Sequence, residues 1–275
     1  MSYLDQLDQF PVKTVSIDGE VQAYREAGTG EQYLVLLHGI SSGSGSWVIQ
    51  LENLVSSFHV IAWDAPGYGQ SEVLKISQPN ARDYATRLKG LFDALNIDKA
   101  IVVGHSLGAF QASAFASQYP EQVLSLVLAN AAQGYGNDSP EKQLEVFQKR
   151  PKMLQELGAE GMAERRGPHL IYQQKPEALD LLKNMMGNIQ LEGFRHASYL
   201  LAYDAIQQYL TQLVVETYAI AGNQDGITSL DSIQKLVNEF PSIHFYQIND
   251  AGHLSYIDQS EQFNQIILTI ASKSK

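Results

Sequence analysis

The sequence predicts an α/β fold: a mostly parallel central sheet flanked by helices, with an inserted helical segment. Short apolar runs of strand length alternate with longer amphipathic segments along most of the chain. Because these short runs are apolar throughout, we expect the strands to be buried on both faces, as in a parallel sheet covered by helices. The alternation stops between residues 134 and 210 and then resumes, so the sheet is interrupted and afterwards completed.

Six strands are predicted before the interruption. Asp18-Gly19 is a turn dipeptide between two strand-like stretches, which indicates a hairpin. The next four runs are continuously apolar, and amphipathic helices are expected between them. The predicted strands are residues 12–17, 21–27, 33–37, 60–63, 100–103 and 123–129, and the predicted helices are residues 81–95 and 107–118.

The segment from residue 134 to residue 210 is predicted to be a helical cap. Glycine and proline separate its helical stretches, which are residues 140–157, 161–166, 176–186 and 191–210. The core then resumes with a strand at 214–221, a helix at 229–240, a strand at 243–248 and a helix at 260–272. The predicted organisation is an α/β core of residues 1–133 and 211–275 that carries a cap of residues 134–210.

Composition excludes several classes of function. The chain has 275 residues, with Lys+Arg 19 and Asp+Glu 30, and its net charge of −11 would repel a nucleic acid or an anionic membrane surface. It has no cysteine, which excludes disulfides, thiolate metal sites and a cysteine nucleophile. The apolar stretches are shorter than the roughly 20 residues of a membrane span, and residues 1–11 lack the features of a secretory signal. We therefore expect a soluble, cytoplasmic protein that acts on a small molecule, and the oligomeric state stays open.

A G-x-S-x-G pattern, Gly104-His105-Ser106-Leu107-Gly108, lies between a predicted strand and a predicted helix. This context indicates a tight strand-to-helix turn, where glycines remove Cβ atoms that would clash with the strand and the helix. The Ser106 hydroxyl would then be exposed above the sheet at the positive end of the helix. The alternative is a glycine-flanked serine that only caps the helix, and the flanking elements favour the nucleophile.

With these residues the chain resembles the α/β-hydrolase superfamily of serine hydrolases over essentially its whole length. Four further segments carry the resemblance in the family's order: His38-Gly39, residues 64–71 (DAPGYGQS), residues 222–225 (GNQD) and Ala251-Gly252-His253. The resemblance implies an α/β-hydrolase fold with a cap inserted after the sixth strand, and the catalytic order Ser, acid, His. These segments are specific for the fold and say little about the substrate.

His253 is the predicted base and Asp225 the predicted acid. A serine hydroxyl needs a base, and a carboxylate must orient that base. Of the seven histidines, His253 alone lies after the last predicted strand, in a loop that a glycine precedes. The family also permits the acid after the sixth strand, but Asn130 occupies that place, and Asp250 is too close in sequence to His253.

The resemblance places the oxyanion hole at the backbone N–H groups of Ile40 and Leu107. Leu107 follows the nucleophile, and Ile40 follows His38-Gly39, whose histidine is expected to orient the loop. Removing one donor of this kind costs roughly 2.7–4 kcal/mol of transition-state stabilisation.

Neither a cofactor nor a metal ion is expected. The glycines at positions 67 and 69 lack the full G-x-G-x-x-G pattern, and no Lys-Ser or Lys-Thr pair follows a glycine run. No group of histidines and carboxylates has metal-ligand spacing.

Five residues are candidates for substrate binding: Trp47, Arg165, Arg166, Met186 and Arg195. Trp47 follows a serine- and glycine-rich stretch that we interpret as a structured loop at the ligand-binding edge of the sheet. An arginine over the active site would bind a substrate carboxylate through two hydrogen bonds. The alternatives are packing for the apolar residues and a solvent-facing position for each arginine.

We expect a serine hydrolase that cleaves a small carboxylic ester or lactone through an acyl-enzyme. The cap is loosely similar to that of enol-lactone hydrolases. One alternative is a carbon–carbon bond hydrolase of the meta-cleavage type, whose Gly-Pro-Gly signature residues 41–47 match only in their glycines. The other is a ligand-binding receptor or scaffold that keeps the fold, which slow turnover and tight ligand retention would distinguish.

Overall fold

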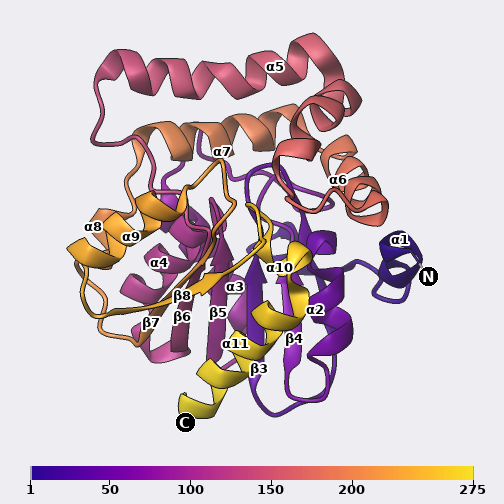
Figure 1. Cartoon of the computed structure of the whole chain (residues 1–275), viewed down its shortest axis with the longest axis vertical. Helices are drawn as coiled ribbons and strands as arrows, with labels where there is room; N and C mark the ends of the chain where they lie inside the picture. Colours follow the sequence, from indigo (N-terminus) through magenta and orange to yellow (C-terminus); the bar gives the residue numbers. More distant parts are fainter. Residues whose placement is uncertain (1, 275) are drawn as a thin grey trace.

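An eight-stranded sheet forms the centre of the protein in the computed structural model, which describes residues 2–274 (Figure 1). The strand order is β1-β2-β4-β3-β5-β6-β7-β8. The strands from β4 to β8 in this order are parallel, whereas β2 runs antiparallel to both β1 and β4. The mostly parallel sheet predicted from the sequence is confirmed. The strands are β1 (Lys13–Ile17), β2 (Glu20–Ala27), β3 (Tyr33–Leu37), β4 (His59–Trp63), β5 (Ala100–His105), β6 (Val123–Ala129), β7 (Thr217–Gly222) and β8 (Ile243–Ile248).

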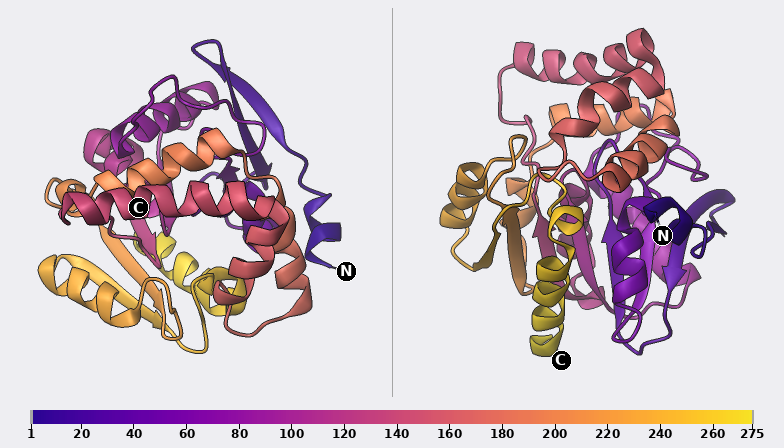
Figure 2. Two further views of the ribbon diagram at one scale, coloured as in Figure 1. Left: turned by 90° about the horizontal axis from the view of Figure 1, so that it is seen from above. Right: turned by 45° about the vertical axis from the view of Figure 1, so that its right-hand side comes forward.

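Helices cover both faces of the sheet, which explains why its parallel strands are apolar throughout. α3 (Ala81–Ala94) packs with α4 (Gly108–Gln118) on one face, and α2 (Val48–Asn53) packs with α11 (Ser260–Lys273) on the other (Figures 1 and 2). α9 (Leu230–Glu239) lies against β7 and β8. Every residue of β5 and of β7 is buried. Among residues 2–274, no helix has the length and apolarity that crossing a membrane requires.

The predicted strands all occur, and the differences concern strand ends and short helices. The helix predicted over 191–210 ends at Tyr203, because Asp204 is extended and its carboxylate accepts a hydrogen bond from the Ala81 N–H (2.9 Å). Helices of only a few residues are not predicted, because they are too short to show a helical period. The remaining short helices are α1 (Tyr3–Leu7), η1 (Ser44–Trp47), η2 (Pro120–Gln122), η3 (Gly167–His169), α8 (Gln207–Leu210) and α10 (Ser255–Asp258).

Three helices lie above the carboxyl ends of the parallel strands (Figures 1 and 2). We call α5 (Pro140–Arg166), α6 (Pro176–Gly187) and α7 (Leu191–Tyr203) the helical layer. α5 packs against both α6 and α7, and Gly158, with φ 67°, divides it into two helical halves. The layer therefore covers the sheet edge at which ligands bind in open α/β proteins.

A close contact between two glycines fastens the layer to the core. Gly193, in the first turn of α7, lies so near Gly67, in the loop after β4, that an added Cβ on Gly193 would be 2.0 Å from the Gly67 carbonyl oxygen. The Gln190 side chain donates a hydrogen bond to the Gly69 carbonyl beside this contact (3.1 Å). Only glycine fits at position 193, because the neighbouring group is backbone and cannot rotate away.

Gly193→Ala is expected to lower the free energy of unfolding by about 1–3 kcal/mol, because the new methyl group overpacks the contact. Gly187→Ala is the control, since a Cβ there meets nothing within 4 Å, and it should leave stability unchanged or slightly raised. Urea unfolding followed by circular dichroism measures both variants. Equal stability of the two variants would show that the glycine contact does not constrain the layer.

Candidate active site

Ser106 lies at the turn between β5 and α4 in a left-handed backbone conformation, with φ 53°. This conformation is strained for a residue with a Cβ. The turn requires its glycines: a Cβ on Gly104 would lie 2.3 Å from the Gly108 carbonyl oxygen, and one on Gly108 would lie 2.4 Å from the Leu37 carbonyl oxygen. The Ser106 N–H donates to the Ala129 carbonyl (3.0 Å), which ties the turn to β6. This local geometry holds the serine at the wall of a cavity above the sheet.

Asp225, in the loop after β7, holds the imidazole of His253, in the loop after β8. His253 Nδ1 donates to Asp225 Oδ2 at 2.9 Å. Because a carboxylate only accepts, Nδ1 carries the proton and Nε2 is able to accept one. Ser106 and His253 line the same cavity, and within residues 2–274 no hydrogen bond joins their side chains. This contact commonly tightens only when substrate binds.

The Asp225 carboxylate is buried and receives hydrogen bonds at both oxygens. Oδ1 accepts from the N–H groups of Ile227 (2.7 Å) and Thr228 (3.0 Å). Besides His253, Oδ2 accepts from the Thr228 hydroxyl (2.6 Å) and from Asn130 Nδ2 (2.9 Å). Burial alone would raise the pKa of Asp225, but the hydrogen bond and charge of His253, with the bonds from Thr228 and Ile227, hold that pKa well below its usual value. The carboxylate is therefore charged at neutral pH.

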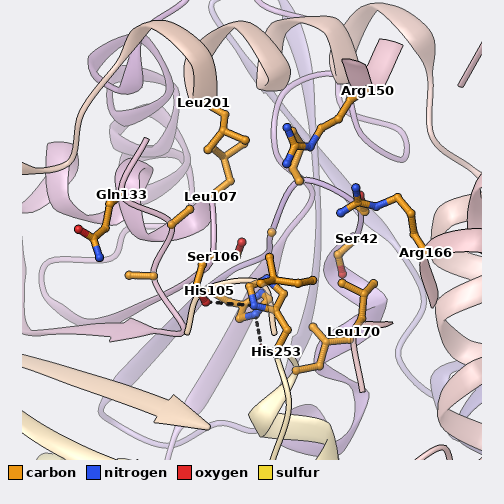
Figure 3. A pocket seen from close by; sticks show the side chains of 18 of the residues that line it. Ser42, His105, Ser106, Leu107, Gln133, Arg150, Arg166, Leu170, Leu201 and His253 are labelled. Carbon is orange, nitrogen blue, oxygen red and sulfur yellow. Dashed lines mark hydrogen bonds between the residues drawn. The ribbon is translucent and has the colours of Figure 1, made fainter. Parts of the chain in front are cut away.

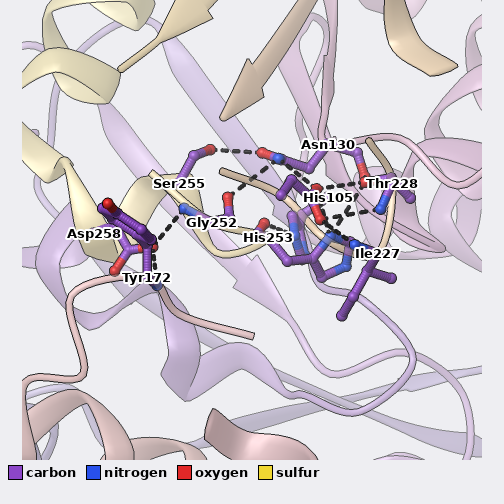
Figure 4. Close-up of polar contacts among 10 residues, drawn as sticks. His105, Asn130, Tyr172, Ile227, Thr228, Gly252, His253, Ser255 and Asp258 are labelled. Carbon is purple, nitrogen blue, oxygen red and sulfur yellow. Dashed lines mark hydrogen bonds and ion pairs between the residues drawn. The ribbon is translucent and has the colours of Figure 1, made fainter. Parts of the chain in front are cut away.

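Asn130 stands after β6, at the place that the resemblance allows for the acid. The Ser255 hydroxyl donates to Asn130 Oδ1 (2.6 Å) (Figure 4). The amide nitrogen is therefore free to donate to Asp225. Asn130 supports the carboxylate from the neighbouring strand, a role that the sequence does not indicate.

Ile40 and Leu107 line the same cavity as Ser106. In the described part of the chain, their backbone N–H groups donate to no backbone carbonyl. Two uncommitted N–H donors beside a serine are able to hold a developing oxyanion.

The loop that carries Ile40 is held by the loop after β4. The Ala65 N–H donates to His38 Nε2 (3.0 Å), so His38 Nδ1 carries the proton and donates to the Gly39 carbonyl (2.8 Å). The Tyr68 hydroxyl donates to the Ile40 carbonyl (2.7 Å). Burial lowers the pKa of His38, which favours the neutral imidazole that these bonds require.

A cavity of about 260 Å³ lies between the sheet edge and the helical layer (Figure 3). The layer contributes Arg150, Arg166, Leu182 and Leu201 to its wall. No aspartate or glutamate is among the described residues that line it. Within residues 2–274, no group of three or more histidine, cysteine, aspartate or glutamate side chains could hold a metal ion.

The structure brings Arg166 to this cavity but not the other four residues predicted to bind substrate. Trp47 is fully buried and stacks on an aromatic ring of α10, and Met186 is fully buried in the core. Arg165 and Arg195 are exposed, and Arg195 lies over an aromatic ring of α5. The prediction is corrected for these four, because a helical pattern does not reveal which turn of each helix faces inward until the helix is docked.

Asp258, in α10, is a site residue that the sequence analysis misses. Its Oδ2 accepts from the N–H groups of Gly252 (2.7 Å) and Tyr172 (2.9 Å) (Figure 4). Its Oδ1 accepts from the Gln173 N–H (3.3 Å). One carboxylate therefore ties the segment between α5 and α6 to the loop of His253. The only sequence signal is an acid shortly after that histidine, which indicates nothing about its partners.

The comparisons with known proteins agree with this architecture. A family model described as alpha/beta hydrolase fold matches residues 32–171. A 2-hydroxy-6-oxononadienedioate/2-hydroxy-6-oxononatrienedioate hydrolase from Paraburkholderia phymatum is 28% identical over 259 residues, which cover 89% of this chain and 88% of that protein. A malate-bound thermophilic esterase from Thermogutta terrifontis has a TM-score of 0.83 at 27% identity, covering 96% of this chain and 97% of the other. An enol-lactonase from Burkholderia xenovorans LB400 has a TM-score of 0.84 at 20% identity, covering 94% of this chain and 100% of the other.

Asp225→Asn is expected to lower the free energy of unfolding at pH 7 by about 1–3 kcal/mol, because the new amide turns a donor toward groups that themselves donate. The folded pKa of Asp225 lies below its unfolded value, so the charge contributes stability above about pH 4 and loses it as pH falls through the folded pKa. The difference between wild type and variant should therefore be largest near neutral pH and shrink on acidification. Urea unfolding between pH 3 and pH 7 measures it, and a difference that grows toward low pH would contradict the assignment.

Proposed function

We propose that this chain, which belongs to the α/β hydrolase fold family and is a hydrolase, cleaves a small carboxylic ester or lactone through a serine nucleophile. The observation that carries the proposal is the convergence of three kinds of group on one cavity. These are the strained Ser106, the histidine His253 held by Asp225, and the N–H groups of Ile40 and Leu107. A nucleophile, an oriented base and oxyanion donors are what acyl transfer requires.

In the acylation half-reaction, Ser106 Oγ attacks the substrate carbonyl carbon while His253 Nε2 takes the hydroxyl proton. The charge that develops on the carbonyl oxygen is held by the two N–H donors, and Asp225 stabilises the imidazolium. The bond between the carbonyl carbon and the leaving oxygen then breaks. His253 returns the proton to that oxygen, which releases an alcohol and leaves an acyl-enzyme.

In the second half-reaction, water replaces the alcohol. The water oxygen attacks the acyl carbon while His253 takes a proton from the water. His253 then passes that proton to the Ser106 oxygen as the acyl bond breaks. An ester therefore gives an acid and an alcohol, and a lactone gives a single hydroxy acid.

The segment of residues 134–210 serves, in this proposal, as a cap on the core of residues 1–133 and 211–275. Support comes from the position of the helical layer over the sheet edge and from the side chains that it contributes to the cavity (Figures 1 and 3). With a volume of about 260 Å³, this cavity suits a small substrate.

Ser106→Ala is expected to reduce turnover of 4-nitrophenyl esters at least a thousandfold, because in this mechanism the Ser106 hydroxyl forms the acyl bond. Release of 4-nitrophenol from a series from acetate to octanoate measures it, and the preferred chain length sizes the acyl side of the cavity. Ser117→Ala, in the same helix α4, is the matched control and should keep full activity. Substantial residual turnover in the Ser106→Ala variant would refute the mechanism.

Carbon–carbon bond hydrolysis is the second candidate, because the relative from Paraburkholderia phymatum is named as a hydrolase of 2-hydroxy-6-oxononadienedioate, a ketone without an ester bond. The same serine and histidine would attack a ketone carbonyl, and the leaving group would be a carbon that must be protonated. His105 cannot readily donate that proton, since its Nε2 is bound to the His253 carbonyl (2.8 Å). Burial and the nearby His253 also hold the pKa of His105 well below its usual value. His253 would therefore have to return the serine proton to that carbon, as it returns it to the leaving oxygen of an ester.

The two candidates differ in their expected substrate ratio. The best 4-nitrophenyl ester should give a kcat/KM at least tenfold above that of 2-hydroxy-6-oxononadienedioate, with both activities lost in Ser106→Ala. Absorbance at the dienoate band and at 4-nitrophenolate follows the two reactions. A ratio in favour of the dienedioate would make the protein a carbon–carbon bond hydrolase.

A further inference from the structure

The candidate catalytic cavity is cationic in an otherwise acidic protein. The chain has a net charge of −11, yet the described residues that line the cavity include two arginines, Arg150 and Arg166, and no carboxylate. An uncompensated pair of positive charges in a largely buried site is unfavourable unless a negative charge joins it.

Both arginines come from α5 and converge on the same space. Gly158 breaks α5 between them, so they belong to two separately directed helical halves. Figure 3 shows the two guanidinium groups directed into the space above Ser106 and His253. A straight helix would hold these two side chains far apart along its axis, so the break at Gly158 is what lets them meet.

Neither guanidinium has a protein partner in the described part of the chain. The Nε atoms of Arg150 and Arg166 are buried and lack a hydrogen-bond partner, and neither side chain takes part in an ion pair there. Buried arginines are normally satisfied by a carboxylate, a phosphate or carbonyl oxygens. The unused donors of both arginines are thus available to a ligand in the cavity.

The electrostatics of the two arginines favour an anionic ligand. Burial and the charge of Arg166 lower the pKa of Arg150 to about 10, and burial lowers that of Arg166. Both groups are still protonated at neutral pH, so two like charges face one another across the cavity.

We propose that Arg150 and Arg166 form a subsite for a carboxylate of the substrate that does not react, so that the enzyme selects half-esters or lactones of dicarboxylic acids. The proposal rests on the proposed function for the reaction at Ser106 and adds the substrate class. The planar guanidinium groups can each bind a carboxylate through two N–H donors. Binding energy from this remote group would then help to orient the reacting carbonyl.

The test compares 4-nitrophenyl hexanoate with mono(4-nitrophenyl) adipate, which differ by the terminal carboxylate. Wild type should prefer the adipate ester in kcat/KM. Arg150→Met and Arg166→Met should each lower the adipate-to-hexanoate ratio of kcat/KM roughly 10- to 100-fold, because each variant loses one charged hydrogen-bonding partner. Arg165→Met, a neighbour that is exposed and does not line the cavity, is the matched control and should leave the ratio unchanged.

Binding of adipate to the Ser106→Ala variant, measured by isothermal titration calorimetry, tests the subsite without turnover. Adipate should bind this variant at least tenfold more tightly than 1,6-hexanediol, which has no carboxylate, and replacing either Arg150 or Arg166 by Met should largely remove that difference. An unchanged ester ratio in both arginine variants, or adipate binding that is insensitive to them, would overturn the subsite. If no ester is turned over, the proposed function fails, while the calorimetry still decides whether the subsite exists.

Discussion

The left-handed turn at Ser106 is the constraint on which the rest of the site depends. A non-glycine residue in this conformation costs roughly 1–3 kcal/mol, so the surrounding structure must hold it in place. The turn joins β5, in which every residue is buried, to α4, of which nearly the whole length is buried. Gly104 and Gly108 let strand and helix approach closely enough to make that burial possible. The strain is therefore offset by the apolar core on either side, and the hydroxyl needs no partner of its own to stay in position.

Around this turn, the polar groups are arranged so that one carboxylate organises several strands. Asp225 follows β7, Asn130 follows β6 and His253 follows β8, and all three meet because the carboxyl ends of parallel strands share one edge of the sheet. Each partner donates to Asp225, so its charge is stabilised by directed hydrogen bonds despite its burial. The same bonds decide which nitrogen of His253 carries the proton. The fold thus sets both the position and the protonation of the predicted base.

The sequence predicts those features of the fold and site that local backbone preferences determine. It does not predict features that depend on how separate elements pack against one another. The strands, the parallel sheet and the turn at Ser106 follow from local apolar runs and glycine placement, and these the sequence predicts correctly. The contribution of Asn130 could not be foreseen, because it depends on the orientation of an amide that Ser255, at the start of α10, fixes. Trp47 lies next to the predicted oxyanion loop in sequence, but its ring turns into the core. Sequence proximity to a catalytic loop does not determine the direction of a side chain.

The helical layer is the part of the fold that the sequence predicts least, because the direction of its side chains depends on how its helices pack. Backbone contacts nevertheless fix its position relative to Ser106 and His253. Leu170 follows Arg166 by one short 3-10 turn, and its carbonyl accepts a hydrogen bond from the N–H of Leu254 (2.9 Å), the residue after His253. Asp258 binds backbone N–H groups on both sides of that junction. These main-chain hydrogen bonds therefore fix the backbone that carries Arg166 relative to the loop that carries His253. A substrate held by Arg166 would meet His253 in a register set by main-chain hydrogen bonds, which is the preorganisation that selective acyl transfer needs.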